Sequence, residues 1–148
     1  MAEELGNPQW IDIARSFITS LGVARTDDAL ALLAPDATYR VLGRHALSGT
    51  FVGRDAIGEH LAALITQTDG RFDPVKFVDW MLGLRHVSLL VDVHVEVGRA
   101  EQLLRHLILM AFNIDDQIEE VTVFSSDPDV AERLYSHFLR DELTDKDT

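Results

Sequence analysis

The chain has 148 residues, 47% of them hydrophobic, which is the size and composition of one globular domain with a single core. Its 25 acidic side chains outnumber the 13 basic ones, and the net charge of -12 disfavours nucleic acid and anionic membranes as partners. There is no cysteine, which excludes disulfides, thiolate metal sites and cysteine nucleophiles. The sequence shows neither a secretion signal nor a run of about 20 apolar residues, so we expect a cytoplasmic protein.

Helical periodicity is strongest at the beginning of the chain. Apolar residues spaced three and four apart predict a helix over residues 10–21, with Pro8 in its first turn and Gly22 at its end. A second, short helix is predicted to begin at Thr26, as its N-cap, and to stop at Pro35. Both helices have an apolar side that a sheet could cover.

A strand over residues 37–42 and a glycine-containing loop over 43–55, with a short extended piece at 50–52, separate these helices from a third. The third helix is predicted from about residue 55 to residue 66. Its buried stripe would consist of Ile57, Leu61, Leu64 and Ile65. His60 lies on the polar side of this pattern and is predicted to be a surface residue.

The second half of the chain is typical of β structure. Its four predicted strands cover residues 74–82, 86–97, 102–114 and 118–125. The connections are short, which predicts an antiparallel meander. A last helix is expected from Ser126 or Asp127, with apolar residues Val130, Leu134, Tyr135 and Phe138. We therefore expect one α+β domain over residues 1–140, in which helices cover one face of the sheet, and a charged, flexible tail over residues 141–148.

The segment SLLVDVHVEV, residues 88–97, alternates almost perfectly between apolar and polar side chains. Its apolar row is Leu89, Val91, Val93, Val95 and Val97, and its polar row includes Asp92 and His94. Successive side chains of a strand point to opposite faces, so one orientation decides where both rows lie. Such a strand is most often half exposed, with its polar row in solvent. The alternative is that the polar row lines a pocket.

The order of the elements resembles the SnoaL-like branch of the nuclear-transport-factor-2-like (NTF2-like) superfamily. The segments DALALLAPDATYRV, GRHALSGTFVGRDAI and IEEVTVFSSD carry this resemblance, which covers nearly the whole chain. It implies a cone-shaped α+β half-barrel with helices on the concave side of a curved antiparallel sheet and a deep, mostly apolar pocket between them. It also implies a homodimer through the convex face. Ketosteroid isomerase, polyketide cyclases, limonene epoxide hydrolase and non-catalytic binding proteins share this fold, so the fold leaves the activity open.

Two catalytic patterns of that superfamily are absent at the matching positions. A site similar to that of ketosteroid isomerase would need a tyrosine and an aspartate where this chain has Phe17 and Val41. A SnoaL-type cyclase would need a histidine and an aspartate where it has Leu109 and Val123. None of these four side chains can transfer a proton, so neither mechanism is expected.

The pattern of limonene epoxide hydrolase is retained in part. Tyr39 and Asp92 match its tyrosine and one of its acids, whereas Val41, Leu90 and Val123 replace its asparagine, its arginine and its second acid. Hydrolysis by that route is therefore not expected. The retained acid nevertheless belongs to the pocket-facing row, so the resemblance favours Asp92 and His94 pointing inward. The valine row would then face a partner subunit or the convex surface.

Pairing of the two central meander strands suggests a catalytic group around Asp92 and His94. His94 would lie opposite Arg105 or His106, and on the first alternative Asp92, His94 and Arg105 share one face. An imidazole, a carboxylate and a guanidinium are parts for general acid–base catalysis, and Tyr39 could add a hydroxyl donor. The remaining ligand-binding residues would be apolar: Phe17, Val41, Trp80, Leu90, Leu107, Leu109 and Val123.

Other candidates are weaker. Asp92 and His94 give only part of a ligand set, so no metal site is expected, and no cofactor is implied. His45 lies on a loop that could close over the mouth of a pocket, although a single loop histidine is more often exposed to solvent.

Two functions follow from these patterns. The first is an acid–base enzyme of the isomerase, cyclase or hydrolase type, acting on a hydrophobic polyketide- or terpene-like molecule. The second is a non-catalytic module of the same fold that binds an apolar ligand or a second copy of itself. A homodimer is expected in both cases, because the valine row together with Ile108, Met110 and Phe112 would otherwise expose a large apolar patch.

Overall fold

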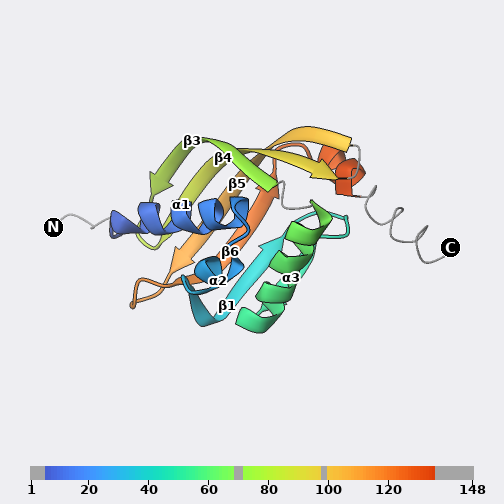
Figure 1. The fold of residues 1–148 in the computed structure, drawn as a ribbon. Coiled ribbons are helices and arrows are strands. Elements are labelled where there is room, and N and C mark those ends of the chain that lie inside the picture. The colour runs from blue at the N-terminus through green and yellow to red at the C-terminus, as the bar shows by residue number, and fades with distance from the viewer. Residues whose placement is uncertain (1–5, 69–71, 98–99, 136–148) are drawn as a thin grey trace.

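The computed structural model describes residues 6–68, 72–97 and 100–135, except for the side chains of Val97 and Ala100. Within these ranges one sheet is formed by β1 (Leu33–Val41), β2 (Gly49–Val52), β3 (Phe72–Leu82), β4 (His86–Val97), β5 (Ala100–Phe112) and β6 (Ile118–Ser125). Figure 1 shows the sheet curving around helix α1 (Gln9–Gly22), with α2 (Thr26–Leu30) and α3 (Arg54–Gln67) beside it. The predicted α+β half-barrel with helices on the concave side is confirmed.

Helix α1 begins and ends within one residue of its predicted bounds. Its buried side chains, among them Ala14 and Phe17 with 0% exposure, recur at the spacing of one helical stripe. Burial of this stripe against the sheet fixes the helix across the concave face. Among the described helices, none is long and apolar enough to cross a membrane.

Helix α2 is shorter than predicted. It ends at Leu30, before the predicted stop at Pro35, and Arg25 rather than Thr26 occupies its N-cap position. The reason is strand pairing, because Leu33 is already opposite Ile118 of β6 and has 0% exposure. Pairing with a distant strand overrides the local helical pattern here.

The last described helix covers residues 128–135, and Asp127 caps it by accepting a hydrogen bond from the Val130 N–H at 3.1 Å. This confirms the predicted start at Asp127. The predicted apolar residue Phe138 and the predicted tail over residues 141–148 lie outside the described residues.

The four strands of the second half form the predicted antiparallel meander, in the spatial order β3, β4, β5, β6. The order continues to β1, which pairs with β6 in parallel, and then to β2, which pairs with β1 antiparallel. The parallel pairing places Tyr39 opposite Val121 and Val41 opposite Val123. This pairing therefore joins the first described strand of the sequence to the last one.

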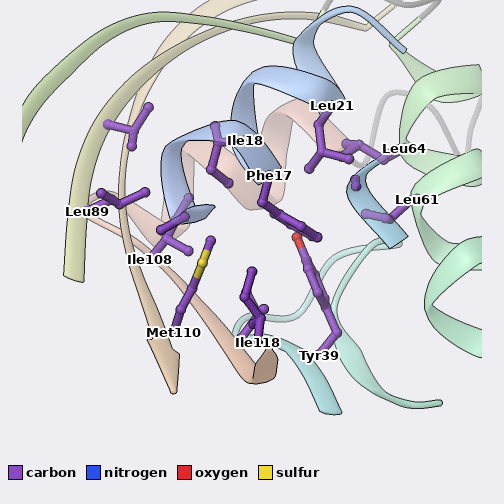
Figure 2. Close-up of a cluster of buried hydrophobic side chains, with 14 of the residues drawn as sticks. Phe17, Ile18, Leu21, Tyr39, Leu61, Leu64, Leu89, Ile108, Met110 and Ile118 are labelled. Carbon is purple, nitrogen blue, oxygen red and sulfur yellow. The ribbon is translucent and has the colours of Figure 1, made fainter. Parts of the chain in front are cut away.

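The valine row of β4 faces inward, so the predicted orientation of this strand is wrong. Val91, Val93 and Val95 have 0% exposure, whereas Asp92 and His94 point to the outer face. Figure 2 shows Leu89 of β4, with Ile108 and Met110 of β5, on the side of the sheet that faces α1. Burial of the aliphatic row is favourable, whereas burial of the ionisable row (Asp92, His94 and Glu96) would remove charged groups from water, which explains the orientation. The side chain of Val97 lies outside the described residues.

This orientation also removes the reason for expecting a homodimer through the valine row. The apolar residues of β4 and β5 that were expected to form a dimer patch, including Ile108, Met110 and Phe112, are at most 2% exposed within one chain. They form the core rather than a partner surface. Any partner on the sheet must therefore bind the opposite face.

Candidate functional site

A pocket lies on the concave side of the sheet, where α1, α3, β1, β5 and β6 approach one another. The cavity has a volume of about 40 Å³, which is enough for a few water molecules. Most of the lining is aliphatic or aromatic, and its ionisable members are two tyrosines and three histidines: Tyr39, Tyr135, His45, His60 and His106. None of the described residues that line it is an aspartate, glutamate, lysine or arginine. The pocket is apolar and carries polar groups without formal charge.

Tyr39 enters the pocket from the middle of β1. Its side chain is 4% exposed, and Figure 2 shows the hydroxyl oxygen directed toward Phe17 of α1. The two rings have centroids 6.2 Å apart. Val41, two residues further along the same strand face, also lines the pocket, as does Val123 of the neighbouring β6. Three of the predicted site residues are thus brought together.

His60 enters the pocket from α3, and its prediction as a surface residue is wrong. The side chain is 7% exposed, stacks on the Phe51 ring at 4.2 Å and lies 5.3 Å from the Tyr39 ring. It falls three residues after Ile57 and four before Leu64, both buried. That spacing placed it on the buried stripe of the helix, and its residue type alone suggested otherwise.

His106 enters from β5, on the same strand face as Ile108. The side chain is 6% exposed, and its Nδ1 atom is buried without a hydrogen-bond partner in the described part of the chain. Buried polar atoms of proteins are nearly always hydrogen-bonded, so an unpaired imidazole nitrogen is exceptional. The strand parity of Ile108 could have indicated this position from the sequence.

His45 reaches the pocket from the loop between β1 and β2. Its Nδ1 atom accepts a hydrogen bond from the Leu47 backbone N–H at 3.1 Å, and its ring lies 4.7 Å from the ring of Tyr135. Because Nδ1 is an acceptor, the neutral ring carries its proton on Nε2. His45 and Tyr135 therefore form one wall of the pocket, and the expectation that this loop lies at a pocket mouth agrees with their position.

Burial keeps these ionisable groups neutral. Burial, and to a smaller extent the nearby His45, lower the pKa of His60 and of His106 to about 4. Burial also lowers the pKa of His45 and raises the pKa of the hydroxyls of Tyr39 and Tyr135. At neutral pH the pocket therefore offers protonated hydroxyls and neutral imidazoles, which can donate or accept hydrogen bonds.

The polar groups of this pocket are largely unused by the protein itself. Within the described ranges, the hydroxyls of Tyr39 and Tyr135 and the ring nitrogens of His60 and His106 make no hydrogen bond to the protein. The rings of Tyr39, His60 and Tyr135 pack against other aromatic rings instead. Such a set can bind a neutral molecule that brings its own donors and acceptors.

Asp92, His94 and Arg105 lie on the outer face of the sheet and do not reach the pocket. Asp92 is directly opposite Arg105, and the guanidinium donates to both carboxylate oxygens at 2.7 and 3.1 Å. The hydrogen bonds from Arg105 lower the pKa of Asp92. His94 lies opposite Leu103 and pairs with Glu101 at 2.8 Å. The predicted register, with His94 opposite Arg105 or His106, is therefore wrong by at least two residues, because the turn between the strands is tighter than expected. Asp92, His94 and Arg105 do share one face, as predicted, while Tyr39 is on the other face.

The other predicted lining residues are also outside the pocket. Leu90, Leu107 and Leu109 share the outer face with Asp92. Phe17 is a core residue next to Tyr39, and Trp80 is 43% exposed, with its ring 5.1 Å from the guanidinium carbon of Arg15. The alternating period of the strands determines this division. A role of Asp92 and His94 in catalysis stays a prediction, now for a solvent-facing position.

One group in the described chain has the spacing of metal ligands. One ligand atom each from His94, Glu96 and Glu101 lie within 4.8 Å of one another, on the outer face near the end of β4. Glu101 is exposed, and its carboxylate already pairs with His94. Solvated groups of this kind are common without a metal, and nothing else at this position points to one.

No protein-family model and no curated protein matches the sequence. Solved structures do match its fold. A protein of unknown function with a cystatin-like fold from Xanthomonas campestris is 24% identical, with a TM-score of 0.78 over 85% of this chain and 97% of that one. An NTF2-like protein from Burkholderia xenovorans is 13% identical, with a TM-score of 0.73 over 89% and 99% of the two chains.

A third similar structure is a Mycobacterium tuberculosis protein in complex with estradiol-17beta-hemisuccinate. It is 14% identical, with a TM-score of 0.69 over 80% of this chain and 94% of that one. At such identities the similarity establishes the fold and leaves the activity open. The chain has the NTF2-like fold, and the finer resemblance to the SnoaL branch stays a prediction.

Proposed function

We propose that this protein binds a neutral, largely apolar small molecule in the pocket around Tyr39, His60 and His106. The observation that carries the proposal is the unpaired Nδ1 of His106, buried in an apolar pocket that has no formal charge. A ligand hydroxyl or amine could donate to this nitrogen, and an apolar body would replace water against the aliphatic wall. A charged ligand would find no counter-charge there and would lose its hydration without compensation.

A protein of the same fold supports the apolar part of this ligand class. The Mycobacterium tuberculosis protein was solved with estradiol-17beta-hemisuccinate, which joins an apolar steroid to a succinate carboxylate. The neutral character of the ligand proposed for this chain rests on the uncharged lining of its pocket. Tyr39 and His106 offer the corresponding donors and acceptors in this chain. A polyketide- or terpene-like molecule has the same combination of properties.

A fluorescence titration with the neutral probe N-phenyl-naphthylamine tests this function. We expect saturable binding by the wild-type protein and binding weaker by at least about tenfold in Val123→Phe, which fills the pocket from its β6 wall. The matched control is Thr122→Phe, on the neighbouring position of the same strand outside the pocket lining. Equal affinity in Val123→Phe and wild type would overturn the proposal, and so would a wild-type protein that binds no probe.

A second candidate function is acid–base turnover of the bound molecule. The Tyr39 hydroxyl and the His60 ring, 5.3 Å apart between ring centroids, are the observation in its favour. Proton transfer is most efficient when the pKa of the catalytic group lies near the working pH, whereas burial holds the pKa of His60 near 4. Binding alone is therefore better supported. Turnover that disappears in Tyr39→Phe, with probe affinity unchanged, would establish the enzyme.

We also propose that the outer face of the sheet pairs with a second copy of the chain. Exposed apolar side chains gather there, with exposures of 56% for Leu103 and 39% for Leu107. Sedimentation at micromolar concentration should show a dimer, and the Leu107→Lys variant should shift it toward monomer. Val52→Lys, on the edge strand β2, is the control. A monomeric wild-type protein would rule out this pairing.

A further inference from the structure

A second cavity adjoins the pocket on the other side of His45. It measures about 200 Å³ and is lined by Leu42, Gly43, His45, Phe124, Ser125, Pro128 and Ala131. Four of these residues also line the inner pocket: Leu42, His45, Ser125 and Ala131. The two cavities are therefore adjacent, and we call them the inner and the outer compartment. Tyr39 belongs only to the inner compartment, and Phe124 belongs only to the outer one.

The inner compartment is too small to hold a ligand of the proposed class by itself. Its volume is about 40 Å³, whereas a cavity that binds benzene measures roughly 150 Å³. Together with the outer compartment, the space approaches the lower end of the range typical of small-molecule sites. A molecule with even one ring must therefore use both compartments, and the side chains between them decide whether it can.

His45 is the shared side chain that can move without disturbing the core. Its backbone is anchored, because the His45 N–H donates to the Ser48 hydroxyl and the His45 carbonyl accepts from the Ser48 N–H, both at 3.0 Å. The ring itself has one hydrogen bond, from the Leu47 N–H, and one ring contact, with Tyr135. Rotation of the ring about its own side-chain bonds thus opens the wall while the loop keeps its shape.

Gly43 leaves room for the ring in the loop. It has a φ of +133°, and a Cβ at that position would lie 3.1 Å from the His45 ring and 3.1 Å from the Ser48 hydroxyl. A larger residue would be strained at this φ and would press on the ring, so glycine allows the ring to lie in the wall. The Nε2–H of the ring remains as a donor at the boundary between the compartments.

We propose that His45 separates two compartments of one ligand site, and that its displacement lets a single elongated, neutral ligand occupy both. The inference rests on the proposed function and defines its ligand class further. The apolar end lies in the inner compartment with Tyr39 and His106. An oxygen atom near the middle of the molecule accepts a hydrogen bond from the Nε2–H of His45. The other end of the molecule lies beside Phe124.

Nuclear Overhauser contacts from bound N-phenyl-naphthylamine to the ring protons of Tyr39 and Phe124 test the arrangement. We expect contacts to both rings at one probe per chain. Contacts to Tyr39 alone would overturn the two-compartment site and leave the proposed function standing. Contacts to Phe124 alone, or no binding, would overturn both proposals.

Stopped-flow association rates test the role of His45. His45→Asn keeps an acceptor for the Leu47 N–H but lacks most of the ring, so the loop stays anchored and the wall opens. We expect association of the probe to be at least about tenfold faster than in wild type. The control is His86→Asn, on the exposed first residue of β4. His45→Ala provides a second opening variant, and rates within about twofold of wild type in both would overturn the role of His45.

Discussion

The two faces of the sheet carry histidines in opposite circumstances. His106 on the concave face is 6% exposed, has an unpaired buried nitrogen and has its pKa lowered to about 4. His94 on the outer face is paired with a carboxylate at 2.8 Å and retains 31% of its side-chain exposure. Each strand alternates between these two environments residue by residue. The same residue type is therefore a buried neutral group with an unpaired nitrogen on one face and a hydrogen-bonded partner of a carboxylate on the other.

This difference indicates where chemistry and recognition are concentrated. Groups on the outer face satisfy one another, since Arg105 bonds Asp92 and Glu101 bonds His94. Groups on the concave face leave hydrogen-bonding capacity unused, which a ligand can fill. A cluster of complementary charges is thus less informative about function here than a few polar atoms without partners.

The largest effect is expected when a charged side chain replaces an apolar one on the concave face. Val91→Asp places a carboxylate at a position with 0% exposure, and we expect it to lower the free energy of unfolding by about 4 kcal/mol or more. Asp92→Val, one residue along on the outer face, should leave a folded protein with a similar urea midpoint. Urea denaturation followed by circular dichroism measures both. Equal destabilisation by the two changes would contradict the assignment of the faces.

Acid should lower the free energy of unfolding through the buried histidines of the concave face. The pKa of His60 and of His106 is about 4 in the folded protein, against the ordinary histidine value of 6.5 that applies to the unfolded chain. The unfolded chain therefore binds more protons between these values, and the stability present above pH 6.5 is lost as the pH falls toward 4. The loss amounts to about 3 kcal/mol for each histidine. Urea denaturation across this pH range measures the slope.

Variants assign that slope to the pocket. His106→Leu should flatten the dependence between pH 6.5 and 4, because it removes one of the buried groups. Carboxylates also titrate in acid, but their contribution to the slope is the same in the variant and in wild type, so it cancels when the two slopes are compared. An unchanged slope in His106→Leu would show that this histidine is not buried as a neutral group.

The smallest effect is expected at the ion pair of Asp92 with Arg105. Its geometry lowers the pKa of Asp92, so the contribution of the pair is present above the usual carboxyl pKa and is lost as the pH falls through the lowered one. Solvent screens the pair, and Asp92→Asn should change the urea midpoint at neutral pH only marginally. A large loss of stability in Asp92→Asn would show that this ion pair is buried within the proposed dimer and is not screened by solvent.

Much of the fold follows from periodicity in the sequence. The stripe of α1 and the strands of the meander were predicted because apolar residues recur with the helical and strand periods. The alternation of β4 gave the two rows of its side chains but not which row faces inward. The resemblance suggested the wrong answer for Asp92 and His94. The difference in apolar area between the rows gives the right one.

The pocket was predicted less well, because its polar members come from segments far apart in the chain. Tyr39, Val41 and Val123 were included in the predicted site, whereas His60 and His106 were not. Both histidines occupy positions that the periodic pattern assigns to the interior, next to Ile57 and Ile108. A polar residue at such a position is a signal for a site, and it was outweighed by the usual preference of histidine for partial exposure.

The parallel pairing of β1 with β6 has a consequence for how the chain folds. Leu33 lies beside Ile118, so this contact closes most of the chain into a loop before it adds any stability. During synthesis, β1 has no strand to pair with other than the short β2 until β6 has been made. The proposed ligand site, which needs Tyr39 and Val123 together, is therefore completed late. A chain stalled or cut before residue 118 should be captured by chaperones rather than by ligand.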